Sequence, residues 1–316
     1  MAPFFKTGIS ESLALAADSA MTARLSRTRP WLRLIAFIPI SILSVLMTMI
    51  ALVFVSRLAP GLEERMAAMG ERLDDTPFRL IEESIQTLVF AAGLGLISVS
   101  FLAAACVTLR APLREFLWPG RRFDWKLFGA GALLMTAIQL LWIPFALATG
   151  GEWRPPVLDS YYPEHTRIVY AAAMAAGLLV AAAAEEVVFR GVLLRVSGLF
   201  TRRALVLCLV NGVMFSAIHL DPDPVSFLQR TLAGMGWTWA ALRLGGLEFA
   251  IGSHFANNFL LALIWSPMSA AVQVQQAPWS VIVPELITSA IVVTTVELLA
   301  RRRVGADPCP TAPGAA

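Results

Sequence analysis

Long apolar stretches alternate with short polar segments along the chain, and four of these stretches are uninterrupted. About 20 apolar residues in a helix are enough to cross the roughly 30 Å hydrocarbon layer of a membrane. Each uninterrupted stretch therefore predicts a transmembrane helix. These four spans are Leu34–Val55, Leu88–Leu109, Leu127–Thr149 and Val281–Leu299.

Four further apolar segments in the middle of the chain contain Gly, polar and charged residues. Polar or irregular spans are tolerated in a membrane only where they line a cavity or are buried against protein. The pattern predicts an all-α polytopic membrane protein with about eight transmembrane helices, in which these four surround a polar intramembrane cavity. They are Ile168–Phe200, Ala204–Leu220, Val225–Leu242 and Leu247–Ile264.

Composition agrees with a membrane protein, because 57% of the residues are apolar and only 15% are charged. The net charge of +3 reflects basic residues that flank the spans: Arg24 to Arg33 before the first, Arg110 to Lys126 after the second and Arg301 to Arg303 after the last. The positive-inside rule then places both termini in the cytoplasm. No basic patch is interleaved with aromatic residues, which argues against a nucleic-acid partner.

This pattern divides the chain into five parts. We expect a cytoplasmic tail over residues 1–33, three scaffold spans over 34–167, a catalytic core over 168–264, a loop with the last span over 265–303, and a disordered tail over 304–316. The chain is rich in Ala and Arg and has only two lysines, Lys6 and Lys126. This composition indicates a bacterium of high genomic GC content, and hence the inner membrane.

Ionisable residues inside the polar spans are the first candidates for a site: Glu185, Glu186, His219 and His254. A charged residue at mid-bilayer costs roughly 2.5 to 3.5 kcal/mol on insertion scales, so each needs a partner, a wet cavity or a function. The only other histidine, His165, lies in a polar loop and is expected to be an ordinary surface residue.

Helical spacing predicts different roles for the two glutamates. Residues four apart share a face and neighbours differ by about 100°, so Glu186 and Arg190 are expected to form an ion pair while Glu185 points elsewhere and is free for chemistry. The plainer interpretation is a helix end at the membrane interface. The expected depth of these residues in the membrane favours a functional site over a helix end, because Glu185 precedes Arg202 by 17 residues and His219 follows it by 17. In a helical hairpin the two would lie at one level.

The same four-residue spacing pairs His254 with Asn258, and Phe215 with His219. A carboxylate and an imidazole that share a water can act as a general base, and a second imidazole with a carboxamide can donate hydrogen bonds to an oxyanion. This is the equipment for hydrolysing an amide. The alternative is a zinc site with Glu185, His219 and His254 as ligands and Glu186 as the base, which has weaker support because no HExxH helix is present.

Three motifs then resemble a known family. EEVVFR fits EExxxR, FSAIH fits FxxxH and HFANN fits HxxxN, in this order over Ile168 to Ile264. They are similar to the motifs of the CPBP family, which contains the CAAX-type prenyl-protein endopeptidases and the bacteriocin-processing or immunity proteases. One departure is the short stretch of 35 residues from His219 to His254, which leaves little room for a gating loop.

The resemblance implies an intramembrane endopeptidase acting on a membrane-embedded or membrane-associated peptide or protein. It implies that Glu185 and His219 activate water, that His254 and Asn258 form the oxyanion hole, and that Glu186 and Arg190 support them. No cofactor is assigned, with zinc as the alternative. Peptide maturation, bacteriocin immunity or protein turnover fits a bacterial setting better than prenyl-protein processing. The rival is a non-catalytic transporter or substrate-binding scaffold that uses the same buried polar residues.

Overall fold

The fold is taken from a computed structural model of the chain, which describes residues 30–58, 61, 64, 79–119, 121–148, 153, 155–201, 203–265 and 277–304. The expected disordered tail of residues 304–316 lies outside the described residues except for Val304, and the expected cytoplasmic tail of residues 1–33 lies outside them except for residues 30–33. The subdivision of the chain into five parts stays a prediction.

Helices form all the regular structure of the described residues, as the apolar pattern predicted, and the all-α fold is confirmed. The longer helices that the site depends on are α5 and α7 from the first half and α8 to α13 from the second. The elements are α3 (Pro30–Leu58), α5 (Arg79–Leu109), α6 (Leu113–Leu117), α7 (Trp125–Ala148), α8 (Glu164–Glu186), the π-helix η1 (Val187–Leu193), α9 (Leu194–Ser197), α10 (Ala204–Ala217), α11 (Pro224–Leu244), α12 (Glu248–Leu260), the π-helix η2 (Leu261–Trp265), the 3₁₀-helix η4 (Trp279–Val281) and α13 (Ile282–Val304).

Five of the described helical segments are long and apolar enough to cross a membrane. They match the four uninterrupted predicted spans and the helix of the two glutamates, which continues through η1 and α9. The predicted span Leu127–Thr149 is shorter in the structure, where the apolar segment runs from Trp125 to Phe145. The count of eight is not confirmed, because α10 has 14 residues, α12 has 13, and α11 carries several polar residues. The chain is an integral membrane protein, and its short helix α12 packs against α7, α8 and α11.

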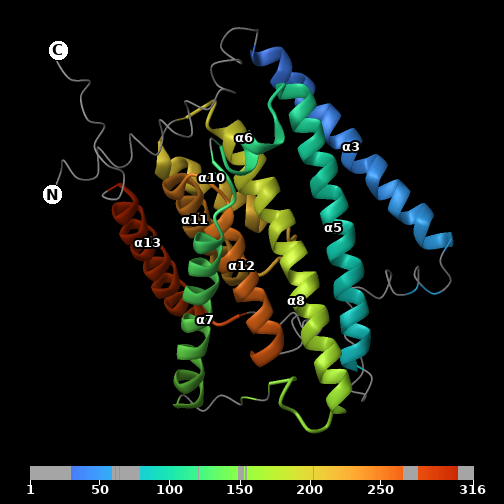
Figure 1. The fold of residues 1–316 in the computed structure, drawn as a ribbon, viewed down its shortest axis with the longest axis vertical. Coiled ribbons are helices and arrows are strands. Elements are labelled where there is room, and N and C mark those ends of the chain that lie inside the picture. Colours follow the sequence, from blue (N-terminus) through green and yellow to red (C-terminus); the bar gives the residue numbers. More distant parts are fainter. Residues whose placement is uncertain are drawn as a thin grey trace, which may run out of the picture.

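The helices lie in an order that places the motif-bearing ones between two edges (Figure 1). At one edge α3 packs on α5, which packs on α8, and at the other α13 packs on α11. Between them α12 contacts α7, α8 and α11, and α10 packs on α11. The two helices that carry the acidic and the third motif, α8 and α12, are therefore neighbours in the middle of the bundle.

Glycines let α7 and α12 approach closely where the two helices cross. A Cβ on Gly131 of α7 would collide with the carbonyl oxygen of Phe249, and a Cβ on Gly252 of α12 would collide with that of Phe128. Small residues at such crossings allow backbones to pack directly in membrane bundles. Gly252 lies two residues before His254, so this crossing fixes the position of the imidazole.

We expect Gly252→Ala to destabilise the fold by about 1 to 3 kcal/mol, the usual range for forcing an extra methyl group into a packed interface. Thermal unfolding of the purified protein in detergent measures this. Gly129→Ala is the matched control, since it lies on the same helix as Gly131 and a Cβ there meets nothing within 4 Å. Equal midpoints for the two variants would contradict the close crossing.

An ion pair holds the first turn of α12. The guanidinium of Arg121 donates to both oxygens of Glu248, at 2.6 and 2.7 Å, and the backbone N–H of Asp124 donates to Oε1 at 3.0 Å. The Glu248 side chain is fully buried. A carboxylate in the first helical turn also interacts favourably with the helix dipole. Both the crossing glycines and this pair therefore position the helix that carries His254 and Asn258.

Candidate active site

The two acidic residues of the first motif end α8, and the arginine of that motif follows in the π-helical segment η1. Arg190 Nη1 lies 2.9 Å from Glu186 Oε1, and both side chains are completely buried. The ion pair predicted from the four-residue spacing is confirmed. The sequence analysis assumed a continuous α-helix here, and nothing in the sequence signalled the change to a π-helix, a form that recurs at functional sites.

Arg190 also ties η1 to α11. Its guanidinium donates to the carbonyl of Gly234 at 3.0 Å and to the hydroxyl of Thr238 at 3.3 Å. The same group lies 4.6 Å from the ring centre of Phe215 and 5.5 Å from that of Trp237. A buried charge is stable only when it is paired and hydrogen-bonded, and Arg190 has both kinds of partner.

His254 lies between the two glutamates. Its Nδ1 is 2.9 Å from Glu186 Oε1, and its Nε2 is 3.7 Å from Glu185 Oε2. The expectation that Glu185 points away from the Glu186 pair is therefore wrong in part, because both carboxylates reach one imidazole from opposite sides. They differ in access: the Glu186 side chain is fully buried, whereas 13% of the Glu185 side chain is exposed.

His219 does not lie inside a helix, contrary to the predicted span that ran to Leu220. The helix α10 ends at Ala217, and His219 lies in the turn before α11, which Asp223 caps by accepting from Ser226 N at 2.8 Å. His219 Nδ1 donates to the carbonyl of Phe215 at 2.8 Å, so a neutral ring has its unprotonated nitrogen at Nε2.

Aromatic rings connect the two histidines. Phe215, predicted as a supporting residue, has its ring centre 5.1 Å from that of His219 and 5.6 Å from that of His254. Trp237 of α11 stacks on His254 with ring centres 4.2 Å apart and planes 16° apart. Sequence analysis missed Trp237, because a tryptophan in an apolar helix gives the same signal as any core residue.

Asn258 lies one helical turn after His254 and belongs to a row of carboxamides. Its Oδ1 accepts from Asn257 Nδ2 at 3.1 Å, and Asn257 Oδ1 accepts from Gln139 Nε2 at 2.8 Å. Its own amide nitrogen makes no hydrogen bond with the residues that the structure describes. Sequence analysis missed Asn257 and Gln139, although a single glutamine in the apolar helix α7 is a signal of a polar partner.

The predicted site residues thus differ in how closely the structure brings them together. Glu185, Glu186 and His254 are in direct contact, and Glu186 continues to Arg190. His219 is linked to His254 through the ring of Phe215, which contacts both imidazoles. Asn258 shares α12 with His254 but has no described contact with the two glutamates.

The zinc alternative does not fit this arrangement. Within the described ranges, no three His, Cys, Asp or Glu side chains are grouped so that they could hold a metal ion. His254 Nδ1 is engaged by Glu186, and Glu186 by Arg190. The set of Glu185, His219 and His254 is therefore not preformed as a ligand sphere, which structural and catalytic zinc sites require.

Comparison with known proteins finds a family model that matches this part of the chain. Residues 167–260 match the family model for type II CAAX prenyl endopeptidases, Rce1-like. This segment is similar to the Rce1-like CAAX endopeptidases. The prediction made from the three motifs is confirmed, and the Rce1-like segment contains every residue of the predicted site. Since that family consists of proteases, a peptidase activity at the membrane is the function class that the match supports.

One curated relative is similar over about half of its length. The uncharacterized protein YyaK of Bacillus subtilis (strain 168) is 28% identical over 169 residues, which cover 49% of this chain and 53% of the relative. The chain therefore spans about half the length of this relative. No solved structure gives a significant match.

Proposed function

We propose that the protein is an intramembrane endopeptidase that hydrolyses a peptide bond of a membrane-associated protein or peptide. The observation that carries this proposal is the position of His254 between Glu185 and Glu186 inside the Rce1-like segment. Two carboxylates and two imidazoles that converge in a bundle of membrane helices provide both a base and oxyanion donors. The same proposal places the protein in a bacterial inner membrane with both termini in the cytoplasm.

Glu185 and His219 are the proposed base. Glu185 Oε2 has no hydrogen-bond partner in the described parts of the chain, and its side chain is the more accessible of the two glutamates. His219 holds its Nδ1 on a carbonyl and leaves Nε2 to accept a proton. A water bound by the Glu185 carboxylate near this nitrogen loses a proton as its oxygen attacks the peptide carbonyl, and the proton passes to the leaving amine.

His254 and Asn258 are the proposed oxyanion donors. Glu186 holds His254 through Nδ1, which leaves the Nε2 side of the ring, beside Glu185, as the side that can face an oxyanion. Asn258 accepts from Asn257 through its oxygen, which leaves its NH₂ group to donate. Removing one donor of this kind typically lowers kcat by about 10² to 10³.

The experiment that tests the proposal is cleavage of membrane-associated peptides by the purified protein in detergent, with products identified by mass spectrometry. We expect cleavage to survive extensive chelation, because Glu186 is already engaged with both His254 and Arg190. The control is the same preparation with zinc added back. Activity that chelation removes and zinc restores would make Glu185, His219 and His254 metal ligands and contradict the proposed mechanism.

A further inference from the structure

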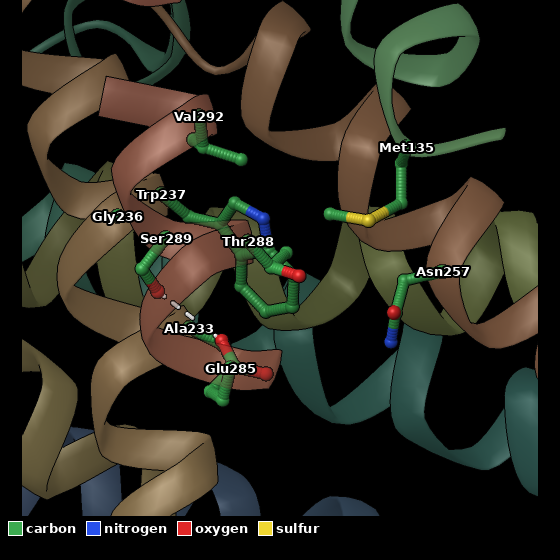
Figure 2. A pocket seen from close by; sticks show the side chains of 9 residues that line it. All are labelled: Met135, Ala233, Gly236, Trp237, Asn257, Glu285, Thr288, Ser289 and Val292. Carbon is green, nitrogen blue, oxygen red and sulfur yellow. Dashed lines mark hydrogen bonds between the residues drawn. The ribbon is translucent and has the colours of Figure 1, made fainter. Parts of the chain in front are cut away.

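A second polar pocket adjoins the site, between α7, α11, α12 and α13. Its empty volume is about 330 Å³, a figure that includes the space at its mouth. Figure 2 shows Glu285, Thr288 and Ser289 on one side, Asn257 and Met135 across from them, and the indole of Trp237 among them. Sequence analysis missed this pocket, because a glutamate in the first turn of an apolar helix is usually an interfacial charge.

Glu285 is the one ionisable residue of the pocket lining, and the lining contains no basic side chain. It lies within the membrane-spanning segment Trp279–Arg303 and accepts a hydrogen bond from the hydroxyl of Ser289 at 3.1 Å. In the part of the chain that the structure describes it has no ion-pair partner. A carboxylate at membrane depth is expensive unless something neutralises it, and such residues mark pathways and sites for ligands.

We propose that this pocket binds an organic ammonium or guanidinium group. Glu285 supplies the charge that neutralises the cation, and the hydroxyl oxygens of Thr288 and Ser289 can accept its N–H groups. The carbonyl oxygen of Asn257 has a second lone pair beyond the bond from Gln139. Trp237 contributes an aromatic ring, and such rings attract ammonium and guanidinium groups. An anion is disfavoured by the same carboxylate.

A molecule bound in this pocket would contact Trp237 and Asn257, which are the neighbours of the two proposed oxyanion donors. Trp237 stacks on His254, and Asn257 donates to Asn258 at 3.1 Å. Two kinds of molecule could supply the ammonium or guanidinium group. One is a Lys or Arg side chain of a bound peptide, and this source rests on the proposed function. The other is a free amine that binds in its own right and acts on His254 and Asn258 through their neighbours.

Binding of n-butylammonium chloride to the full-length protein in detergent, measured by saturation-transfer NMR, tests the pocket without any need for cleavage. We expect the Kd to rise about tenfold in Glu285→Gln, the usual effect of losing one charge-assisted contact. Glu164→Gln, which removes an exposed carboxylate at the start of α8, is the control and is expected to leave the Kd unchanged. n-Butanol, the neutral analogue, is expected to show no difference among the three proteins.

A second variant keeps the charge and reduces the space. A Cβ on Gly236 would meet Val292 and Ser289 only at 3.7 and 4.0 Å, so Gly236→Ala is expected to fold normally and to weaken butylammonium binding. Equal binding by wild type, Glu285→Gln and Gly236→Ala would overturn the proposal. So would a clear loss of thermal stability in Glu285→Gln, since that would assign the carboxylate a structural partner.

Peptide cleavage separates the two sources. A peptide pair that differs only by Lys or norleucine near the cut bond is compared on wild type and Glu285→Gln. A lower KM for the Lys peptide that is lost in the variant supports the substrate source, and butylammonium binding with equal KM values supports the free amine. Butylammonium binding without any cleavage would contradict the proposed function and leave the cation pocket standing.

Discussion

Glu185→Gln is expected to lower the rate of peptide cleavage by about 10² to 10⁴, the contribution of a positioned general base, while thermal unfolding stays nearly unchanged. Glutamine has the same shape but cannot take a proton from water. The fold should tolerate the change because Glu185 Oε2 has no hydrogen-bond partner among the described residues and the imidazole nitrogen Nε2 of His254 lies 3.7 Å away. Cleavage kinetics and an unfolding scan of the same preparations measure both effects.

Two controls make this result specific. Glu164→Gln removes a carboxylate of the same helix at its exposed start and should leave both rate and stability unchanged. His219→Gln should lower the rate with Glu185 intact, because His219 is the other half of the proposed base. Wild-type cleavage by Glu185→Gln would show that another group activates the water.

Glu186→Gln is expected to destabilise the fold by about 3 to 5 kcal/mol, the usual range for breaking a buried ion pair by removing one partner. The change leaves Arg190, whose side chain is also completely buried, without its carboxylate, and it removes the negative charge from the oxygen that accepts from His254 Nδ1. Thermal or denaturant unfolding measures the loss. The midpoint should fall far more than in Glu185→Gln.

The double variant Glu186→Gln with Arg190→Gln completes a mutant cycle for this pair. If the buried charge left behind is the source of the instability, the double variant should lose less stability than the sum of the two single variants. Equal stability losses in Glu185→Gln and Glu186→Gln would instead show that the division of roles between the two glutamates is wrong.

Local spacing was enough to predict contacts within one helix. Glu186 and Arg190 meet as the four-residue rule requires, even though η1 departs from α-helical geometry. The same rule failed for Glu185, because its contact with His254 depends on where α12 packs against α8. Spacing within a helix carries no information about the neighbouring helix, so this contact could not be predicted.

The turn that ends α10, in contrast, could have been predicted from the sequence. The segment that follows His219 reads LDPDP, and Pro with Asp is typical of a turn followed by a capped helix. That signal ends α10 before Leu220, whose φ of 52° is incompatible with a helix. Trp237 and Asn257 were beyond reach for another reason: their role follows from contacts with His254 and Asn258 across or along helices, and their residue types are common in cores.

The length of α10 has a consequence for the lipid around the site. Its 14 residues extend about 21 Å, some 9 Å less than a typical hydrocarbon layer of about 30 Å. The turn that follows contains His219 and Asp221, and an irregular, charged backbone cannot face acyl chains. We expect the leaflet beside α10 to be locally thinner, a case of hydrophobic mismatch. A peptide resting among the headgroups on that side would be nearer to Glu185 than the thickness of an unperturbed bilayer allows.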